Sequence, residues 1–195
     1  MFYGCINLIS LDLPSTFNTQ NVTDMSKMFF KCSKMESLDL SFFHTQNVEN
    51  MDLMFSGCHN LSYINLLSFD TRKVEYMGFM FNECYNLKTL DLSTFIIQNN
   101  VSIAGIFCHC KNLYQINLKN VNIRNANIEC SSYEYEDLFD IKYSKFTNED
   151  KYIKFDDDMK ENSIFYFCDN LKQVIINKKY LDDFKKINPN DIFVY

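Results

Sequence analysis

A 26-residue repeat is the feature that most limits what this chain can fold into. Cysteines mark the interval at Cys32, Cys58, Cys84 and Cys110. The same interval separates the large apolar residues that stand three positions after these cysteines, which are Met35, Leu61, Leu87 and Leu113. A fixed period in this range is typical of a solenoid, in which successive units stack and share one core.

Each unit contains one stretch with helical spacing. Val48, Met51, Met54 and Phe55 fall on a single apolar stripe of a helix, and Gly57 follows as a stop signal. The spacing therefore predicts a short helix in every unit.

A strand-like stretch follows the predicted helix. Leu61, Ile64 and Leu66 stand in the spacing LxxLxL, whose last residues alternate as those of a half-buried strand do. One short helix and one short strand cannot bury their apolar faces alone, so the units must stack. We therefore predict an α/β fold: a solenoid with a parallel β-sheet on one face and short helices on the other.

The fuller pattern of the unit points to a family. It reads NVxxMxxMFxxCxxLxxLxLSxF. Asn47 to Phe69 follows it except at Ile64 and Leu67, and the stretch up to Phe95 follows it except at its first residue, Lys73. This pattern closely resembles the 26-residue repeat of BspA-like leucine-rich-repeat surface proteins, and residues 1–118 follow it. The resemblance implies a leucine-rich-repeat solenoid, exposed on a cell surface, that binds host or matrix proteins or other cells.

We expect one solenoid at 1–177 with about seven units, followed by a C-terminal cap at 178–195. The cap is predicted as a helix at 178–187 and a last strand at 192–195. The sixth unit is degenerate and carries an acidic loop, because residues 121–163 hold 6 Lys or Arg and 11 Asp or Glu. The predicted units are 1–27, 28–53, 54–79, 80–105, 106–131, 132–163 and 164–177.

The first residues match the middle of a unit. Met1 to Cys5 align with Met54 to Cys58, so the chain begins inside a repeat and carries no signal peptide. We expect it to be a fragment of a longer chain, or to have a misplaced start. No run of about 18 apolar residues predicts a membrane span, and the net charge of −6 argues against a nucleic-acid partner.

The recurring cysteines are predicted to form a buried ladder in the core. Neighbouring units would place them about 5 Å apart, which is compatible with disulfide geometry, but their side chains should point the same way. Free Cys behaves as a small apolar residue, so reduced thiols are favoured and disulfides stay the alternative. The predicted ladder is Cys5, Cys32, Cys58, Cys84, Cys110 and Cys168.

Other potential sites have simpler explanations. Cys108, His109 and Cys110 lack a second ligand pair for zinc, and Cys110 is needed in the core. None of the three histidines, His44, His59 and His109, stands in a fixed relation to a cysteine and a carboxylate. The run Asp156 to Asp158 lacks the ligand spacing of an EF-hand and fits a solvated loop. We therefore expect no catalytic site, no metal and no cofactor.

The best candidate site is the outward face of the predicted sheet. Its residues alternate with the buried leucines, so they should share one side, and Asp12 would extend their central Asp and Asn column. The alternative is that these residues only solvate a sheet. The candidate ligand-binding residues are Ser37, Asp39, Tyr63, Asn65, Leu67, Thr89, Asp91, Gln115 and Asn117.

These observations predict a non-catalytic protein-binding module. By resemblance it would be part of a cell-surface or extracellular protein for adhesion or host interaction, with an unidentified protein as partner. The alternative is an intracellular leucine-rich-repeat scaffold. The missing signal sequence favours it, and so do the eight cysteines, which could all stay reduced.

Overall fold

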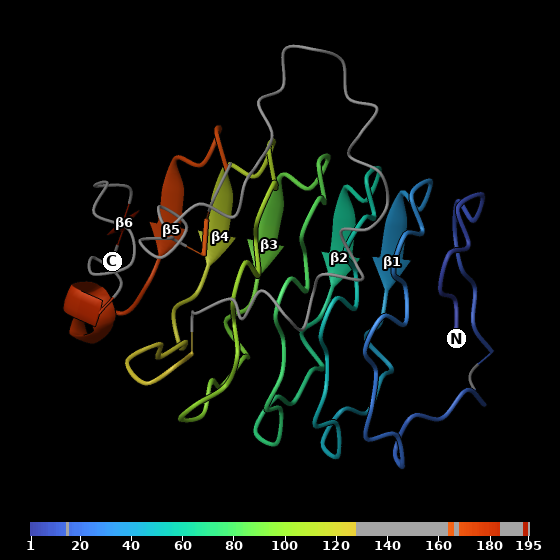
Figure 1. Ribbon diagram of the computed structural model, residues 1–195, viewed down its shortest axis with the longest axis horizontal. Coiled ribbons are helices and arrows are strands. Elements are labelled where there is room, and N and C mark those ends of the chain that lie inside the picture. The colour runs from blue at the N-terminus through green and yellow to red at the C-terminus, as the bar shows by residue number, and fades with distance from the viewer. Residues whose placement is uncertain (15, 128–163, 166–167, 184–192, 195) are drawn as a thin grey trace.

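The structure is a computed structural model that describes residues 1–14, 16–127, 164–165, 168–183 and 193–194. It is mostly β, with short parallel strands in two sheets and little helix (Figure 1). One sheet pairs β1 with β2, and the other runs in the order β3-β4-β5-β6. The strands are β1 (Ser37–Asp39), β2 (Tyr63–Asn65), β3 (Thr89–Asp91), β4 (Gln115–Asn117), β5 (Gln173–Ile175) and β6 (Phe193–Val194).

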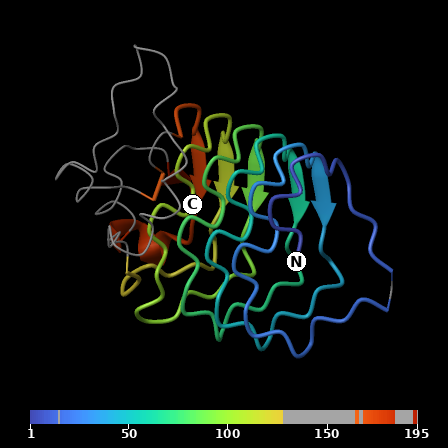
Figure 2. The same ribbon diagram turned by 45° about the vertical axis from the view of Figure 1, so that its right-hand side comes forward.

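The predicted parallel strands are confirmed. Leu38 pairs with Ile64, and Leu90 pairs with Ile116, so the partners lie one repeat apart. Strands β1 to β5 follow one another in chain order and point the same way in both ribbon views (Figures 1 and 2), and β6 pairs in parallel with β5. A second series of isolated parallel bridges also links successive units, through Asp24, Asn50, Tyr76, Ser102 and Asn127.

The predicted short helices are wrong. In the stretch from Met51 to Gly57, alternate amides donate to carbonyls of the following unit: Met51 N to Tyr76 O at 2.7 Å and Phe55 N to Met80 O at 2.9 Å. The amides between them close local turns, as Met54 N does on Met51 O. An α-helix would satisfy these groups within the segment, whereas here half of them bind the neighbouring unit.

Left-handed backbone conformations explain why a helix cannot form there. Leu53 has φ of 58° and Gly57 has φ of 76°, and residues at the same two positions of other units share this conformation. A left-handed residue interrupts a right-handed helix, and the described residues contain four pairs of them, each pair four residues apart: Lys27 and Lys31, Leu53 and Gly57, Phe79 and Glu83, and Gly105 and His109. The helical spacing of Met51, Met54 and Phe55 instead reflects the repeat of tight turns that bring all three side chains into the core.

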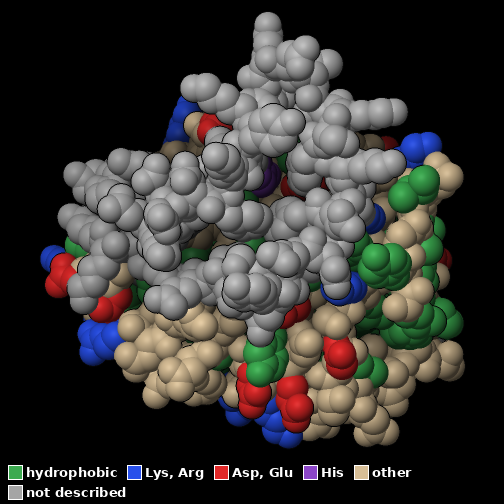
Figure 3. Space-filling view, viewed as in Figure 1, with side chains coloured by type: hydrophobic (Ala, Val, Ile, Leu, Met, Phe, Trp, Pro, Cys, Tyr) green, Lys and Arg blue, Asp and Glu red, His purple; other side chains and the backbone are tan. Residues whose placement is uncertain are grey.

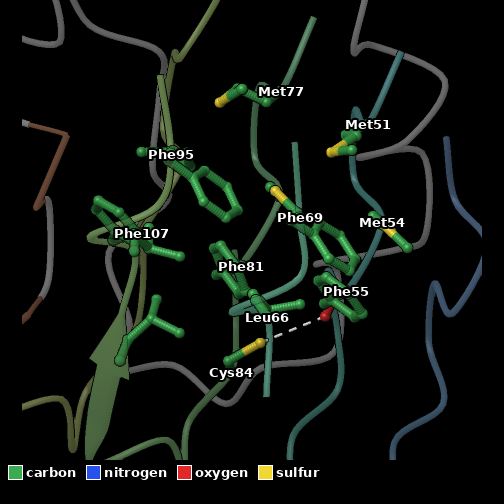
Figure 4. Close-up of a cluster of buried hydrophobic side chains, with 14 of the residues drawn as sticks. Met51, Met54, Phe55, Leu66, Phe69, Met77, Phe81, Cys84, Phe95 and Phe107 are labelled. Atoms are coloured by element: carbon green, nitrogen blue, oxygen red, sulfur yellow. Dashed lines mark hydrogen bonds between the residues drawn. The ribbon is translucent and has the colours of Figure 1, made fainter. Parts of the chain in front are cut away.

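Stacked aromatic rings fill the core. Phe2, Phe29, Phe55, Phe81, Phe107 and Phe165 form one column, in which neighbouring ring centroids lie 5.3 to 6.0 Å apart. A second column joins Phe17, Phe43, Phe69 and Phe95. Methionine and leucine side chains, among them Met54 and Leu66, lie next to the rings of these columns (Figure 4). Ring pairs at this separation contribute roughly 0.5–1.5 kcal/mol each beyond the burial of their area.

Two further features of the packing are not predicted above from the sequence. A smaller buried cluster, separate from the main core, contains Phe30, Leu53, Phe79, Ala104 and Cys108. A ladder of buried threonines consists of Thr19, Thr45 and Thr71, and each hydroxyl binds both an amide and a carbonyl of the next unit. Both sets recur near the 26-residue interval, so the repeat itself carried a signal for them.

The last unit lies directly against the fifth. β5 pairs with β4 in register, with Val174 opposite Ile116, and the Phe165 ring stacks on Phe107 at 5.5 Å. The sequence predicts the degenerate unit 132–163 between them. In the structure, however, the strands next to β4 in the sheet are β3 and β5. Residues 132–163 themselves, with the acidic loop and the run Asp156 to Asp158, lie outside the described residues.

The described part of the predicted cap begins with the 3-10 helix η3 (Lys178–Tyr180), and helical residues continue to Asp183. Arg124 Nε donates to the buried carboxylate of Asp183 at 3.2 Å, which fastens this segment to the fifth unit. The predicted helix beyond 183 lies outside the described residues, while β6 pairs with β5 in parallel. No helix of the described chain is both long and apolar enough to cross a bilayer.

We expect Leu90→Ala to lower the free energy of unfolding by about 2–5 kcal/mol, because the side chain is only 4% exposed and packs in the core. The exposed neighbour Thr89 gives the control, and Thr89→Ala should change stability by less than about 0.5 kcal/mol. Urea unfolding followed by circular dichroism measures both. Equal effects would mean that the strand register is wrong.

A pair of glycine variants tests the left-handed positions. Gly105 has φ of 54°, and a Cβ there would lie 2.4 Å from a ring carbon of Phe79. Gly4 has φ of 69° with open space around it. Gly4→Ala should therefore cost about 1–2 kcal/mol for the backbone alone. Gly105→Ala should cost about 1–3 kcal/mol more in chemical denaturation, because the ring must move within a packed cluster.

Candidate functional site

The outward residues of β1 to β4, together with Leu67, form the surface that the sequence singled out, here called the sheet face. Ser37 and Thr89, the first residues of β1 and β3, are exposed. Leu38 and Leu90, the middle residues of the same strands, are buried, as strand alternation requires. Asn65, Gln115 and Asn117 are half-buried. The structure therefore brings the predicted site residues to one side of the strands.

The central column of this face has a structural task. Asp39 Oδ1 accepts the Ser41 amide at 3.0 Å, and Asp91 Oδ1 accepts the Ser93 amide at 2.8 Å. Asn65 and Asn117 bind the amides of Leu67 and Lys119 in the same way. Each side chain thus holds the turn that ends its strand, as short polar residues do in Asx-turns. The recurrence of Asp and Asn at this position is explained without a ligand.

Electrostatics agree with this role at Asp39. The pKa of its carboxyl is lowered, first by the backbone amide of Ser41, and the Asn65 amide adds a hydrogen bond at 3.2 Å. Hydrogen bonds to the charged form favour that form, so Asp39 stays ionised at neutral pH. It therefore contributes a fixed negative charge to the sheet face.

The side chains that remain available on the sheet face are centred on β2. Tyr63 and Leu67 are each 56% exposed, and neither side chain is used in a turn. Tyr114, directly before β4, is 44% exposed and adds a third large side chain. An exposed aromatic residue with a polar tip offers large contact area at small entropic cost, which suits a protein partner.

Other exposed apolar side chains lie elsewhere. Phe42 is 36% exposed, and Tyr76, 46% exposed, belongs to the bridge series outside the sheets. Apolar side chains gather over the N-terminal units, at the right of the space-filling view (Figure 3). Those of the first unit are Met1, Tyr3, Ile6 and Ile9.

The cysteine ladder lies in the core and has a defined bonding pattern. Each thiol donates to a carbonyl of the preceding described unit, as Cys58 Sγ does to Phe29 O at 3.2 Å and Cys84 Sγ to Phe55 O at 3.3 Å (Figure 4). Cys32, Cys110 and Cys168 repeat this contact. Cys5, Cys32, Cys58, Cys84, Cys110 and Cys168 are free, with Cys5 and Cys168 half-buried. The thiols therefore satisfy backbone carbonyls rather than pairing with one another.

Burial suppresses the reactivity of these thiols. It raises the pKa of Cys32 to about 11, and it also raises the pKa of Cys58, Cys84 and Cys110 well above the usual value. Since the thiolate is the nucleophile, these groups are inert at neutral pH. None of them is placed to act in covalent catalysis.

A cluster of titratable side chains spans the third to fifth units. The His59 ring stacks on Tyr85 at 4.7 Å, and His59 Nε2 lies 3.2 Å from Glu83 Oε2. Lys111 Nζ lies 5.4 Å from the centre of the Tyr85 ring. Burial, followed by Glu83, raises the pKa of Tyr85, while burial lowers the pKa of the nearby His109.

The contacts of this cluster fit a structural role. Three neighbouring units are joined there by a ring stack, a hydrogen bond and a cation over a ring. Within the described residues, no group of three or more His, Cys, Asp or Glu side chains is arranged to hold a metal ion. His44, the remaining histidine, is exposed.

Comparison with known proteins gives one family. A model described as "Mycoplasma protein of unknown function, DUF285" matches residues 1–122 and again 36–149. The chain belongs to this family. The two overlapping matches are what a repeated unit produces, so the DUF285 region is a repeat region. No curated protein and no solved structure matches the chain.

The buried thiols give a labelling test. At pH 8 a thiol with a pKa of about 11 is about 0.1% thiolate, against about 10% for the usual value near 9. We expect iodoacetamide to label Cys32, Cys58, Cys84 and Cys110 at least about 100-fold more slowly in native protein than in urea. Half-buried Cys5 and Cys168 serve as internal comparisons and should react sooner. Mass spectrometry of the digested protein measures the labelling of each cysteine. Prompt labelling of Cys58 in native protein would contradict the buried ladder.

Proposed function

We propose that this chain is a non-catalytic protein-binding module, built as a leucine-rich-repeat solenoid and displayed on a cell surface. Its unit resembles the BspA-like repeat, whose family members act at cell surfaces. The observation that carries the proposal is the pair Tyr63 and Leu67, each 56% exposed on the sheet face. They project from a backbone that neighbouring units hold on both sides, so a partner meets a preorganised surface.

The solenoid part of the proposal rests on the ladders between units. Backbone bonds, stacked phenylalanines, thiols and threonines all join residues about one repeat apart. Such units share a core that no unit has alone, which is the energetic pattern of repeat proteins. The leucine positions Leu38 and Leu90 face inward from their strands, as the resemblance implies.

A second candidate is an intracellular scaffold that binds proteins through the same face. The observation that favours it is the set of free, buried thiols at Cys32, Cys58, Cys84 and Cys110. Reduced thiols at these four core positions are suited to a reducing compartment. Fractionation of cells that produce the protein, combined with protease treatment of intact cells, separates the two candidates: only a surface protein is degraded.

The binding proposal predicts a selective loss on the sheet face. We expect Tyr63→Ala to weaken binding to a protein partner by about 30-fold or more, the range of an interface anchor. The melting temperature should change by less than about 2 °C, because most of the side chain is already in solvent. Surface plasmon resonance against a panel of purified matrix and cell-surface proteins measures the affinity.

Tyr76 provides the matched control, since it is an exposed tyrosine on the bridge series outside the sheets. Tyr76→Ala should leave binding unchanged. If the partner binds both variants with the same affinity, or if only Tyr76→Ala loses binding to the partner, the sheet face is not the binding site. Asp91 is a poor probe, because its carboxylate holds the Ser93 turn.

A further inference from the structure

The charged side chains on and beside the sheet face are divided between its two ends. Exposed carboxylates occur over the first and second units, at Asp12, Glu36 and Asp39. Exposed lysines occur over the fifth and last units, at Lys119 and Lys172. The strands run in chain order from the second unit to the last (Figure 1), so one end of the face is acidic and the other basic.

The middle of the face is close to neutral and carries the largest exposed side chains. The third unit contributes Tyr63 and Leu67 and has no charged residue at these positions. The fourth unit contributes Lys88 and Asp91, whose charges balance. An apolar centre with charged borders is the arrangement of a specific protein interface, in which the centre supplies affinity and the charges supply orientation.

This distribution is self-complementary. A two-fold axis parallel to the strands and centred on β3 would place β1 opposite β5 of a second copy and β2 opposite its β4. The acidic end of each copy would then face the basic end of the other, and both Tyr63 side chains would lie near the axis. Closed two-fold dimers require such a surface, since the same patch meets itself.

We propose that the sheet face binds a second copy of this chain, face to face and with the order of units reversed. The inference rests on the proposed binding role of the sheet face and names its partner. For a protein displayed on a surface, such pairing would join molecules on opposing cells. Opposite charges across the contact also predict that the dimer weakens as salt screens them.

Charge reversal at two matched positions tests the proposal. Glu36 and Lys172 occupy the same position in their units and are exposed, and the described hydrogen bonds involve their backbone groups rather than their side chains. Sedimentation equilibrium should show wild-type dimers forming below about 100 µM at low salt. Glu36→Lys and Lys172→Glu should each weaken the dimer about tenfold or more, because like charges then meet. An equimolar mixture of the two variants should form a heterodimer with restored affinity.

Glu75→Lys is the control, because it makes the same change in net charge at an exposed position next to the bridge series. It should leave the dimer intact. A wild-type protein that stays monomeric overturns the proposal, as does a dimer that both charge variants and Tyr63→Ala leave unchanged. A dimer lost only in Ile9→Lys would place the contact on the first unit instead. In each of these cases the binding role of the sheet face is tested separately. That test measures whether Tyr63→Ala weakens the affinity for a different protein.

Discussion

Hydrogen bonds between successive units are the interaction on which the rest of the structure depends. Strands such as β1 and β2 pair over only three residues, too few to be stable alone. The opposite segment adds a second set of bonds, in which every other amide binds the next unit, as Leu53 does to Gly78. Because these units are tied to their neighbours on both sides, buried backbone groups in the described part of the chain find partners although it contains little helix.

This constraint gives each recurring residue type a specific task. Phenylalanines stack because the same position recurs in register in the next unit, and thiols lie where they meet a buried carbonyl, as Cys84 meets Phe55. Threonines such as Thr45 bind an amide and a carbonyl where the strands have ended. Asp39 and Asp91, which alternate with core leucines and so resemble a ligand-binding column, hold turns. Periodicity therefore identifies structural residues, and the departures from it identify candidate binding residues.

The departures gather on the sheet face. Tyr63 and Leu67 stand at positions where the following units carry polar residues, such as Thr89 and Ser93, and both are well exposed. The charges around them change sign along the stack, from Glu36 to Lys172, although the backbone beneath repeats without change. A uniform scaffold with a non-uniform surface is suited to recognition, because the partner reads side chains whose positions the repeat has already fixed.

The sequence alone determined the period, the parallel strands and the inward positions such as Leu38, because these follow from spacing and strand alternation. It also placed the sheet-face residues on one side. It could not determine the conformation of the segment from Met51 to Gly57, since helical turns and the observed tight turns bury the same positions. Only the tertiary structure decided that, because half of the amides there bind the next unit. Likewise, contacts between units that are distant in the chain decided that β5 follows β4, a choice that no local pattern contains.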